Sequence, residues 1–373
     1  MTTPATKINF RENQNEGIIE QLQDVDFALK MKNAVDVQLI DTNLYMCKEL
    51  WLPWGARGAF GGQVVAQALR AAWDTVDEEF FVHSLHSYFI LACSVEMPVI
   101  YRIQRVRDGK SYATRTVTAL QKGKAIFICS CSFVKPDDSV TLSHQVSGKS
   151  GSNYVQLMIC QTPMPRTVDP ETLTSDIEVL KNTLAITESV PESVRKITQK
   201  RINEVRLPSS LIAQLHAHNF NQDLAIDSRA VRTLSPQQVI SGRVEPSPHS
   251  QRWFKTRGLL NDDMKLHACI IAYASDSGFI TTAAAAHGHL INSKGLGMLA
   301  SLDHSIWFHY PAARADEWLL YDVFSPQADN GRAIVFGKIY NQNGNLVATT
   351  AQEGILRISQ REQEKRKKTA ACL

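Results

Sequence analysis

The sequence predicts an α+β protein built from two copies of one fold, and three observations predict it. A block around His83 recurs around His304, and a turn at Gly123 recurs at Gly344. Both pairs are 221 residues apart (304 − 83 and 344 − 123), and this constant offset indicates a tandem duplication. Each copy also follows the same order, one apolar helical stretch and then strand-like stretches. That order is typical of an antiparallel sheet wrapped around one helix.

The first copy is expected over residues 33–135. Apolar residues recur at helical spacing between Gly61 and Trp73, and many of them are small. A helix of this composition is packed closely on most sides. The stretch 81–135 is rich in strand-forming residues and carries a hairpin turn signal at Asp108-Gly109.

The second copy is expected over residues 238–358. Asn261-Asp262-Asp263 provides a helix N-cap, and Ser275-Asp276-Ser277-Gly278 ends that helix. Strands are predicted at 300–310, 317–324, 332–341 and 345–357, with a hairpin signal at Asn343-Gly344.

Two further segments differ from the copies in composition. Residues 136–237 have a low apolar density and seven scattered prolines, which predicts a connector with helical and loosely ordered parts. Residues 359–373 form a polar, basic tail that is expected to fray.

Composition excludes several classes of partner. The 373 residues are 44% hydrophobic and 21% charged, enough for two packed cores. The net charge of +3 owes much to Lys365–Lys368, so no nucleic-acid partner is expected. No apolar stretch reaches the ~18 residues that a membrane span needs.

Known site motifs are absent or incomplete. There is no GxSxG nucleophile elbow, and no His or Cys cluster has metal-ligand spacing, so neither a metal nor a cofactor is expected. The seven cysteines form no CxxC, and their odd number points to a reducing compartment. Cys129 and Cys131 face the same side of one strand, where i, i+2 neighbours seldom have disulfide geometry, so they are predicted to be small core residues.

Four motifs together resemble one family. They are Phe60–Leu69 (FGGQVVAQAL), Val82–Phe89 (VHSLHSYF), Leu302–His309 (LDHSIWFH) and Ala351–Gly354 (AQEG). These motifs resemble the type II, TesB-like acyl-CoA thioesterases. The resemblance implies a double hotdog fold, two tandem hotdog domains that each wrap an antiparallel sheet around a long central helix. It also implies hydrolysis of fatty acyl-CoA to free fatty acid and CoA, with water as the direct nucleophile.

The resemblance carries a set of site residues onto this sequence. Asp276, Ser301 and Gln352 fall on the family's catalytic positions, with Asp276 as the general base and the other two holding the water. Burial and the nearby helix C-terminus are expected to raise the pKa of Asp276. The backbone N–H groups at Gly61 and Gly62 are expected to hold the oxyanion, and His83 to position or contact the substrate.

The duplication assigns the chemistry to one copy. The position matching Gln352 is Cys131 (352 − 221), and the position matching Ser301 is Phe80 (301 − 221). The first copy therefore lacks these polar groups. The second copy is expected to carry the active site, and the first to supply structure.

Alternatives remain open at this point. A hotdog enoyl-CoA hydratase would need a His about five residues after its Asp, where this chain has Thr281. A non-catalytic acyl-CoA-binding protein would be favoured by a degenerate site.

A homodimer or homotetramer is expected. The C-terminal Ala371-Cys372-Leu373 and the family favour the peroxisome, with the cytoplasm as the alternative.

Overall fold

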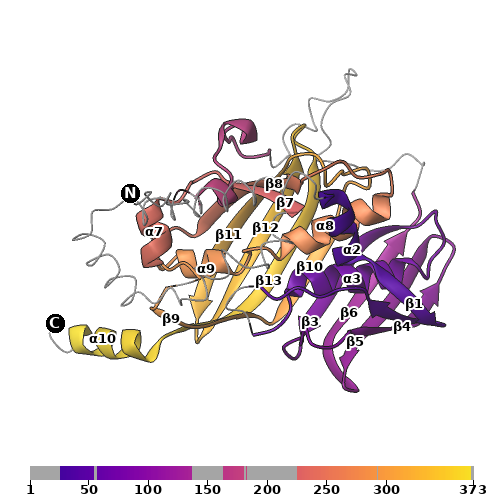
Figure 1. The fold of residues 1–373 in the computed structure, drawn as a ribbon, viewed down its shortest axis with the longest axis horizontal. Coiled ribbons are helices and arrows are strands. Elements are labelled where there is room, and N and C mark those ends of the chain that lie inside the picture. Colours follow the sequence, from indigo (N-terminus) through magenta and orange to yellow (C-terminus); the bar gives the residue numbers. More distant parts are fainter. Residues whose placement is uncertain are drawn as a thin grey trace, which may run out of the picture.

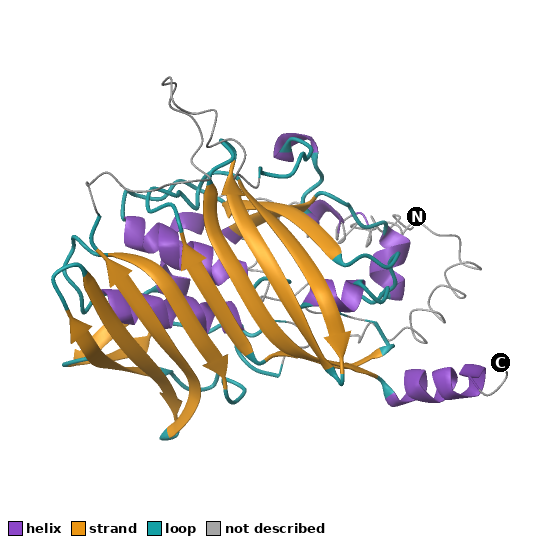
Figure 2. Cartoon of the chain, turned by 180° about the vertical axis from the view of Figure 1, so that it is seen from behind, coloured by secondary structure: helices purple, strands orange, loops and turns teal. Residues whose placement is uncertain are grey.

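The computed structural model describes residues 26–53, 57–136, 163–179, 182, 225–291 and 293–370. Figure 1 shows a broad curved sheet with the main helices on one face, and Figure 2 shows the same sheet from its other side. The first half supplies α2 (Phe27–Val35), β1 (Val37–Asp41), β2 (Leu44–Cys47), α3 (Gly61–Trp73), β3 (Phe81–Phe89), β4 (Ile100–Asp108), β5 (Tyr112–Gln121) and β6 (Lys124–Val134).

The second half repeats this order with additions. It contains β7 (Ile226–Ala230), α7 (Pro236–Ser241), β8 (His249–Thr256), α8 (Met264–Ser275), α9 (Thr281–Ala285), β9 (Leu296–Ser301), β10 (Asp303–Phe308), β11 (Leu319–Asp329), β12 (Arg332–Asn341), β13 (Leu346–Ile358) and α10 (Gln360–Ala370). A 3-10 turn, η2 (Pro170–Thr172), lies between the halves in sequence. The predicted helices, the N-cap at Asp263 and the hairpin turns at Gly123 and Gly344 are confirmed.

The duplication is visible in the strand order β1-β2-β4-β5-β6-β3-β10-β13-β12-β11-β8-β7. The order is the same read from either end once corresponding strands are exchanged. At the centre, β3 pairs antiparallel with β10, and Leu85 lies opposite Ile306. These two residues are 221 apart (306 − 85) and neither side chain is exposed. A pseudo-twofold axis that relates the two copies therefore passes through a buried Leu–Ile pair.

The expected limits of the two copies need correction. Helix α2 begins at Phe27, before the expected start at residue 33, and buries Met31, Ala34 and Val35. Strand β7 begins at Ile226 and pairs with β8, so the second sheet starts before residue 238. Most of the expected connector lies outside the described residues.

Two buried amides explain part of the FGGQVVAQAL motif. Gln63 and Gln67 lie one turn apart on α3, and both side chains are fully buried. Each donates from Nε2 to the carbonyl oxygens of Ala34 and Glu49, at 2.9 to 3.1 Å. These bonds hold the end of α2 and the segment before α3 against the helix, so the carbonyl groups are buried with partners.

Cys129 and Cys131 lie in the core, as expected. Both are buried free thiols on β6, and their sulfur atoms are 3.9 Å apart. No described helix is long and apolar enough to cross a membrane.

Candidate active site

The site forms where α3 begins and α8 ends. The two helices pack antiparallel, with Gly62 against Tyr273 at one end and Arg70 against Asp263 at the other. A Cβ on Gly62 would overlap the backbone oxygen of Tyr273, and one on Gly61 would lie 2.8 Å from Oδ2 of Asp276. Both glycines are therefore required by the close approach of the helices rather than by an unusual φ angle.

Asp276 is the C-cap residue of α8, and its carboxylate meets the N-terminus of α3. The N-cap of α3 is Phe60, whose side chain makes no capping bond. The backbone N–H of Gly62 donates instead to the carboxylate of Asp276. A first-turn N–H of one helix is thus satisfied by the acid of the other.

Gln352, on β13, is the second member of the cluster. Its Nε2 donates to Oδ1 of Asp276 at 2.7 Å and contacts Nδ1 of His304 at 3.2 Å. The side chain is buried, and its Oε1 has no hydrogen-bond partner among the described residues. Leaving a buried amide oxygen without a hydrogen-bond donor costs free energy of folding, so Oε1 is expected to accept a hydrogen bond from a bound molecule.

Burial raises the pKa of Asp276 to about 6, while the hydrogen bonds from Gln352 and Gly62 act in the opposite direction. The direction expected from the sequence is confirmed, with burial as the main cause. The carboxyl group therefore titrates within reach of neutral pH, as a general base requires.

Ser301 lies near this cluster without touching it. It ends β9, where it pairs with Gly354, two residues beyond Gln352 on the neighbouring strand. Alternation along β13 places Ser301 and Gln352 on the same sheet face, about 7 Å apart along the strand. The described structure shows no hydrogen bond from Ser301 to Asp276 or Gln352, so a shared water is the contact that this spacing permits.

His83 is not brought to the cluster. An extra residue in β3 between Val82 and Ser84 shifts the register there, and His83 bonds Ser132 Oγ at 2.8 Å. Ser132 alternates with the buried Cys131 and Phe133, so His83 lies on the sheet face away from α3. Its counterpart His304 is the histidine at the site. The duplicated block contains both histidines, but the sequence of the block alone does not show which of the two side chains faces inward.

The opposite end of the helix pair is the pseudo-symmetric counterpart of the site. Asp74 is the C-cap of α3, as Asp276 is of α8. Here Arg70 contacts Asp36, Asp74 and Asp263 at 3.8, 3.5 and 3.1 Å. An ion-pair network therefore occupies the end where the first copy would have its own site.

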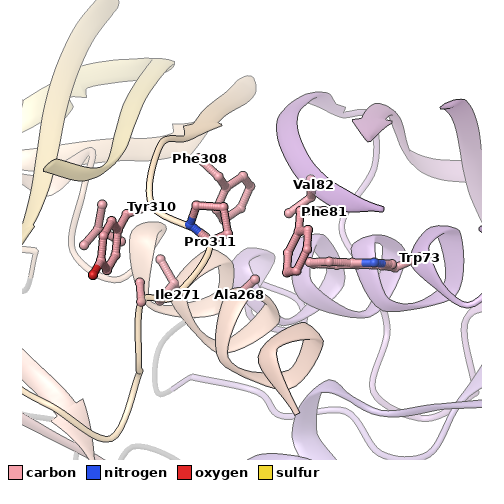
Figure 3. A pocket seen from close by; sticks show the side chains of 10 residues that line it. Trp73, Phe81, Val82, Ala268, Ile271, Phe308, Tyr310 and Pro311 are labelled. Atoms are coloured by element: carbon pink, nitrogen blue, oxygen red, sulfur yellow. The ribbon is translucent and has the colours of Figure 1, made fainter. Parts of the chain in front are cut away.

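A small apolar hollow lies close to that end, between the two halves (Figure 3). Trp73, Phe81 and Val82 line one side, and Phe308, Tyr310 and Pro311 line the other. Tyr310 corresponds to Phe89 by the same offset (310 − 89 = 221), and Phe89 contacts the Gly61 position. Among the described residues, no Asp, Glu, His, Ser or Thr lines the hollow, so it offers no carboxylate, imidazole or aliphatic hydroxyl for catalysis.

Comparison with known proteins agrees with this architecture. Residues 220–355 match the family described as acyl-CoA thioesterase, and residues 50–134 match the acyl-CoA thioesterase N-terminal domain. The chain is 32% identical over 334 residues to acyl-coenzyme A thioesterase 8 of Homo sapiens, covering 89% of this chain and 90% of the relative. It is 26% identical over 319 residues to peroxisomal acyl-coenzyme A thioester hydrolase 1 of Saccharomyces cerevisiae, covering 81% and 86%.

Among solved structures, acyl-CoA thioesterase II TesB2 from Mycobacterium marinum is similar, with a TM-score of 0.61 at 29% identity. The similarity covers 89% of this chain and 98% of that one. The fold and site define a double hotdog protein with a carboxylate and an amide at one helix junction. The chain belongs to the acyl-CoA thioesterase family.

Proposed function

We propose that the protein hydrolyses fatty acyl-CoA thioesters by direct attack of a water molecule held by Asp276 and Gln352. The observation that carries this proposal is the amide of Gln352, which donates to Asp276 and leaves a buried Oε1 without a partner among the described residues. A water between Asp276 and Oε1 would donate one O–H to each acceptor and direct a lone pair at the substrate. Ser301, on the same sheet face, would hold that water or the substrate beside it.

The reaction then needs only groups of this chain. The water oxygen attacks the thioester carbonyl carbon while Asp276 takes a proton from the water. The tetrahedral intermediate collapses, the carbon–sulfur bond breaks, and the proton leaves Asp276 for the CoA sulfur. The products are the fatty acid and CoA. No covalent enzyme intermediate is required.

The oxyanion would be held by Gly61 rather than Gly62. The N–H of Gly62 already donates to Asp276. Gly61 is the first residue of α3, and within the described structure its N–H has no acceptor. Gly61 lies beside Asp276, and its N–H is at the positive end of the helix dipole, where a developing negative charge is stabilised.

The alternative functions have less support. A hydratase of this fold would pair its acid with a histidine that takes part in catalysis. Here Asp276 is hydrogen-bonded to Gln352 instead, and the nearby His304 is buried and neutral. A binding protein would not need an aspartate with a pKa of about 6 beside an amide oxygen that lacks a partner.

We predict that Asp276→Asn and Gln352→Ala each lower kcat/KM by about 100-fold or more, because each removes a group that holds or deprotonates the water. Thiol release from C2 to C18 acyl-CoA esters measures this and gives the chain-length preference. For the wild type, kcat/KM should fall below pH 6 as Asp276 becomes protonated. The matched control is Asp74→Asn, the C-cap acid of the other helix, which should retain wild-type turnover. Equal losses in Asp74→Asn and Asp276→Asn would contradict the site.

We predict that Gly61→Pro is slower than Gly61→Ala by about 100-fold in kcat, because only proline removes the N–H. Proline is accepted at the first helical position, and Phe60 has φ −59° and ψ 126°, which suits a residue before proline. Both variants add a Cβ near Asp276, so their difference isolates the N–H. Equal kcat values would exclude Gly61 as the oxyanion donor.

We also propose a peroxisomal location, supported by the yeast relative whose name places it there. Ala371-Cys372-Leu373 lie outside the described residues. Full-length protein with an N-terminal fluorescent tag should co-localise with a peroxisomal marker, and removal of residues 371–373 should disperse it. Diffuse signal from both forms would favour the cytoplasm.

The expected homodimer or homotetramer stays a prediction, for which sedimentation velocity is the direct measurement.

A further inference from the structure

His304 is buried at the centre of the candidate site and takes no part in the proposed attack by water. Its side chain is inaccessible to solvent, and Phe279 packs edge-on against the ring at 5.6 Å. Burial lowers the pKa of His304 to about 3, so the ring is neutral at any pH where the enzyme would be assayed. It can therefore neither donate a proton as an imidazolium nor reach the substrate directly.

The hydrogen bonds around His304 fix its tautomer. The hydroxyl of Ser275 donates to the backbone oxygen of Ala272 at 2.8 Å, which uses its only proton. The 2.9 Å contact between Ser275 Oγ and His304 Nε2 must then be donated by the ring. Because a neutral imidazole carries one N–H, Nδ1 is an acceptor.

The tautomer in turn fixes the amide of Gln352. The group 3.2 Å from Nδ1 must be a donor, so it is the NH2 of Gln352 and not its oxygen. The same NH2 donates its other proton to Asp276. The Oε1 atom then has to point away from both, toward the position that the proposed water would occupy.

We propose that His304 is a positioning residue that holds the Gln352 amide in the one orientation that serves the reaction. The inference rests on the proposed function. With the amide reversed, Oε1 would face the carboxylate of Asp276, and the NH2 would meet the water where an acceptor is needed. A series of hydrogen bonds thus runs from the carbonyl of Ala272 through Ser275, His304 and Gln352 to Asp276. A backbone carbonyl of α8 therefore sets the direction of a side chain on β13.

The first copy supports this division of roles. The residue matching His304 is His83 (304 − 221), which bonds Ser132 on the other face of the sheet. The residue matching Gln352 is Cys131, which has no amide to orient. The inward histidine is therefore found in the copy that also has the glutamine and the acid.

Two amide variants of His304 separate positioning from packing. In His304→Asn the amide oxygen can take the place of Nδ1 and accept from Gln352. In His304→Gln the end group reaches the Nε2 position near Ser275 and offers Gln352 no acceptor. Both replace the ring with a smaller amide, so cavity effects are similar in the two variants.

We expect His304→Asn to keep kcat/KM within about 10-fold of the wild type, and His304→Gln to lose about 100-fold or more, mainly in kcat. The acid limb of the pH profile should stay near pH 6 in His304→Asn. It should move to higher pH in His304→Gln, because Asp276 loses a hydrogen bond that lowers its pKa. Equal losses with an unmoved acid limb in both variants would show a packing role and overturn the proposal.

Ser275→Ala provides the second test, in case either His304 variant fails to fold. It removes only a hydroxyl, but it lets His304 carry its proton on Nδ1, which would then donate to the Oε1 of a reversed Gln352 amide. We expect a loss of about 10-fold or more in kcat/KM and an acid limb displaced to higher pH. Wild-type kinetics in Ser275→Ala would overturn the proposal. If Asp276→Asn also kept wild-type activity, the proposed function itself would fail, which distinguishes the two claims.

Discussion

The structure depends on the close contact between the start of α3 and the end of α8. Gly61 and Gly62 allow the two helices to approach until a backbone N–H of one reaches the acid of the other. The same contact buries Asp276 and leaves it facing the positive end of a helix dipole. Burial raises its pKa and so makes the carboxylate a stronger base, and the donors around it limit that rise, so the group is still ionised near neutral pH.

The duplicated fold contains two such helix junctions, and only the junction at Asp276 has the side chains that the proposed reaction needs. At the other end of the helix pair, Arg70 contacts three carboxylates and fills the place of the reacting groups. The second half also has 19 more residues between the helix-capping acid and the histidine of the duplicated block (304 − 276 = 28, against 83 − 74 = 9). That insertion forms α9 and β9, and β9 brings Ser301 opposite Gly354. The first half has no equivalent of it.

More of the fold than of the candidate site could be predicted from the sequence. The 221-residue offset predicted two copies of one fold, and the structure joins their sheets at Leu85 and Ile306, which are related by the same offset. Strand β7 and helix α2 were harder to place, since both are short and carry polar residues. The choice between His83 and His304 could not be made from sequence. It depends on one extra residue in β3 that reverses which face the side chain meets.

The central claim is direct attack by water, and the alternative on the same geometry is attack by the Asp276 carboxylate to form an acyl anhydride. A single turnover in H2 18O, with enzyme in excess over acyl-CoA, separates them. Direct attack by water predicts fatty acid carrying one 18O atom and a peptide containing Asp276 without label, both read by mass spectrometry. Unlabelled fatty acid from the first turnover, with 18O in the Asp276 carboxylate, would contradict it.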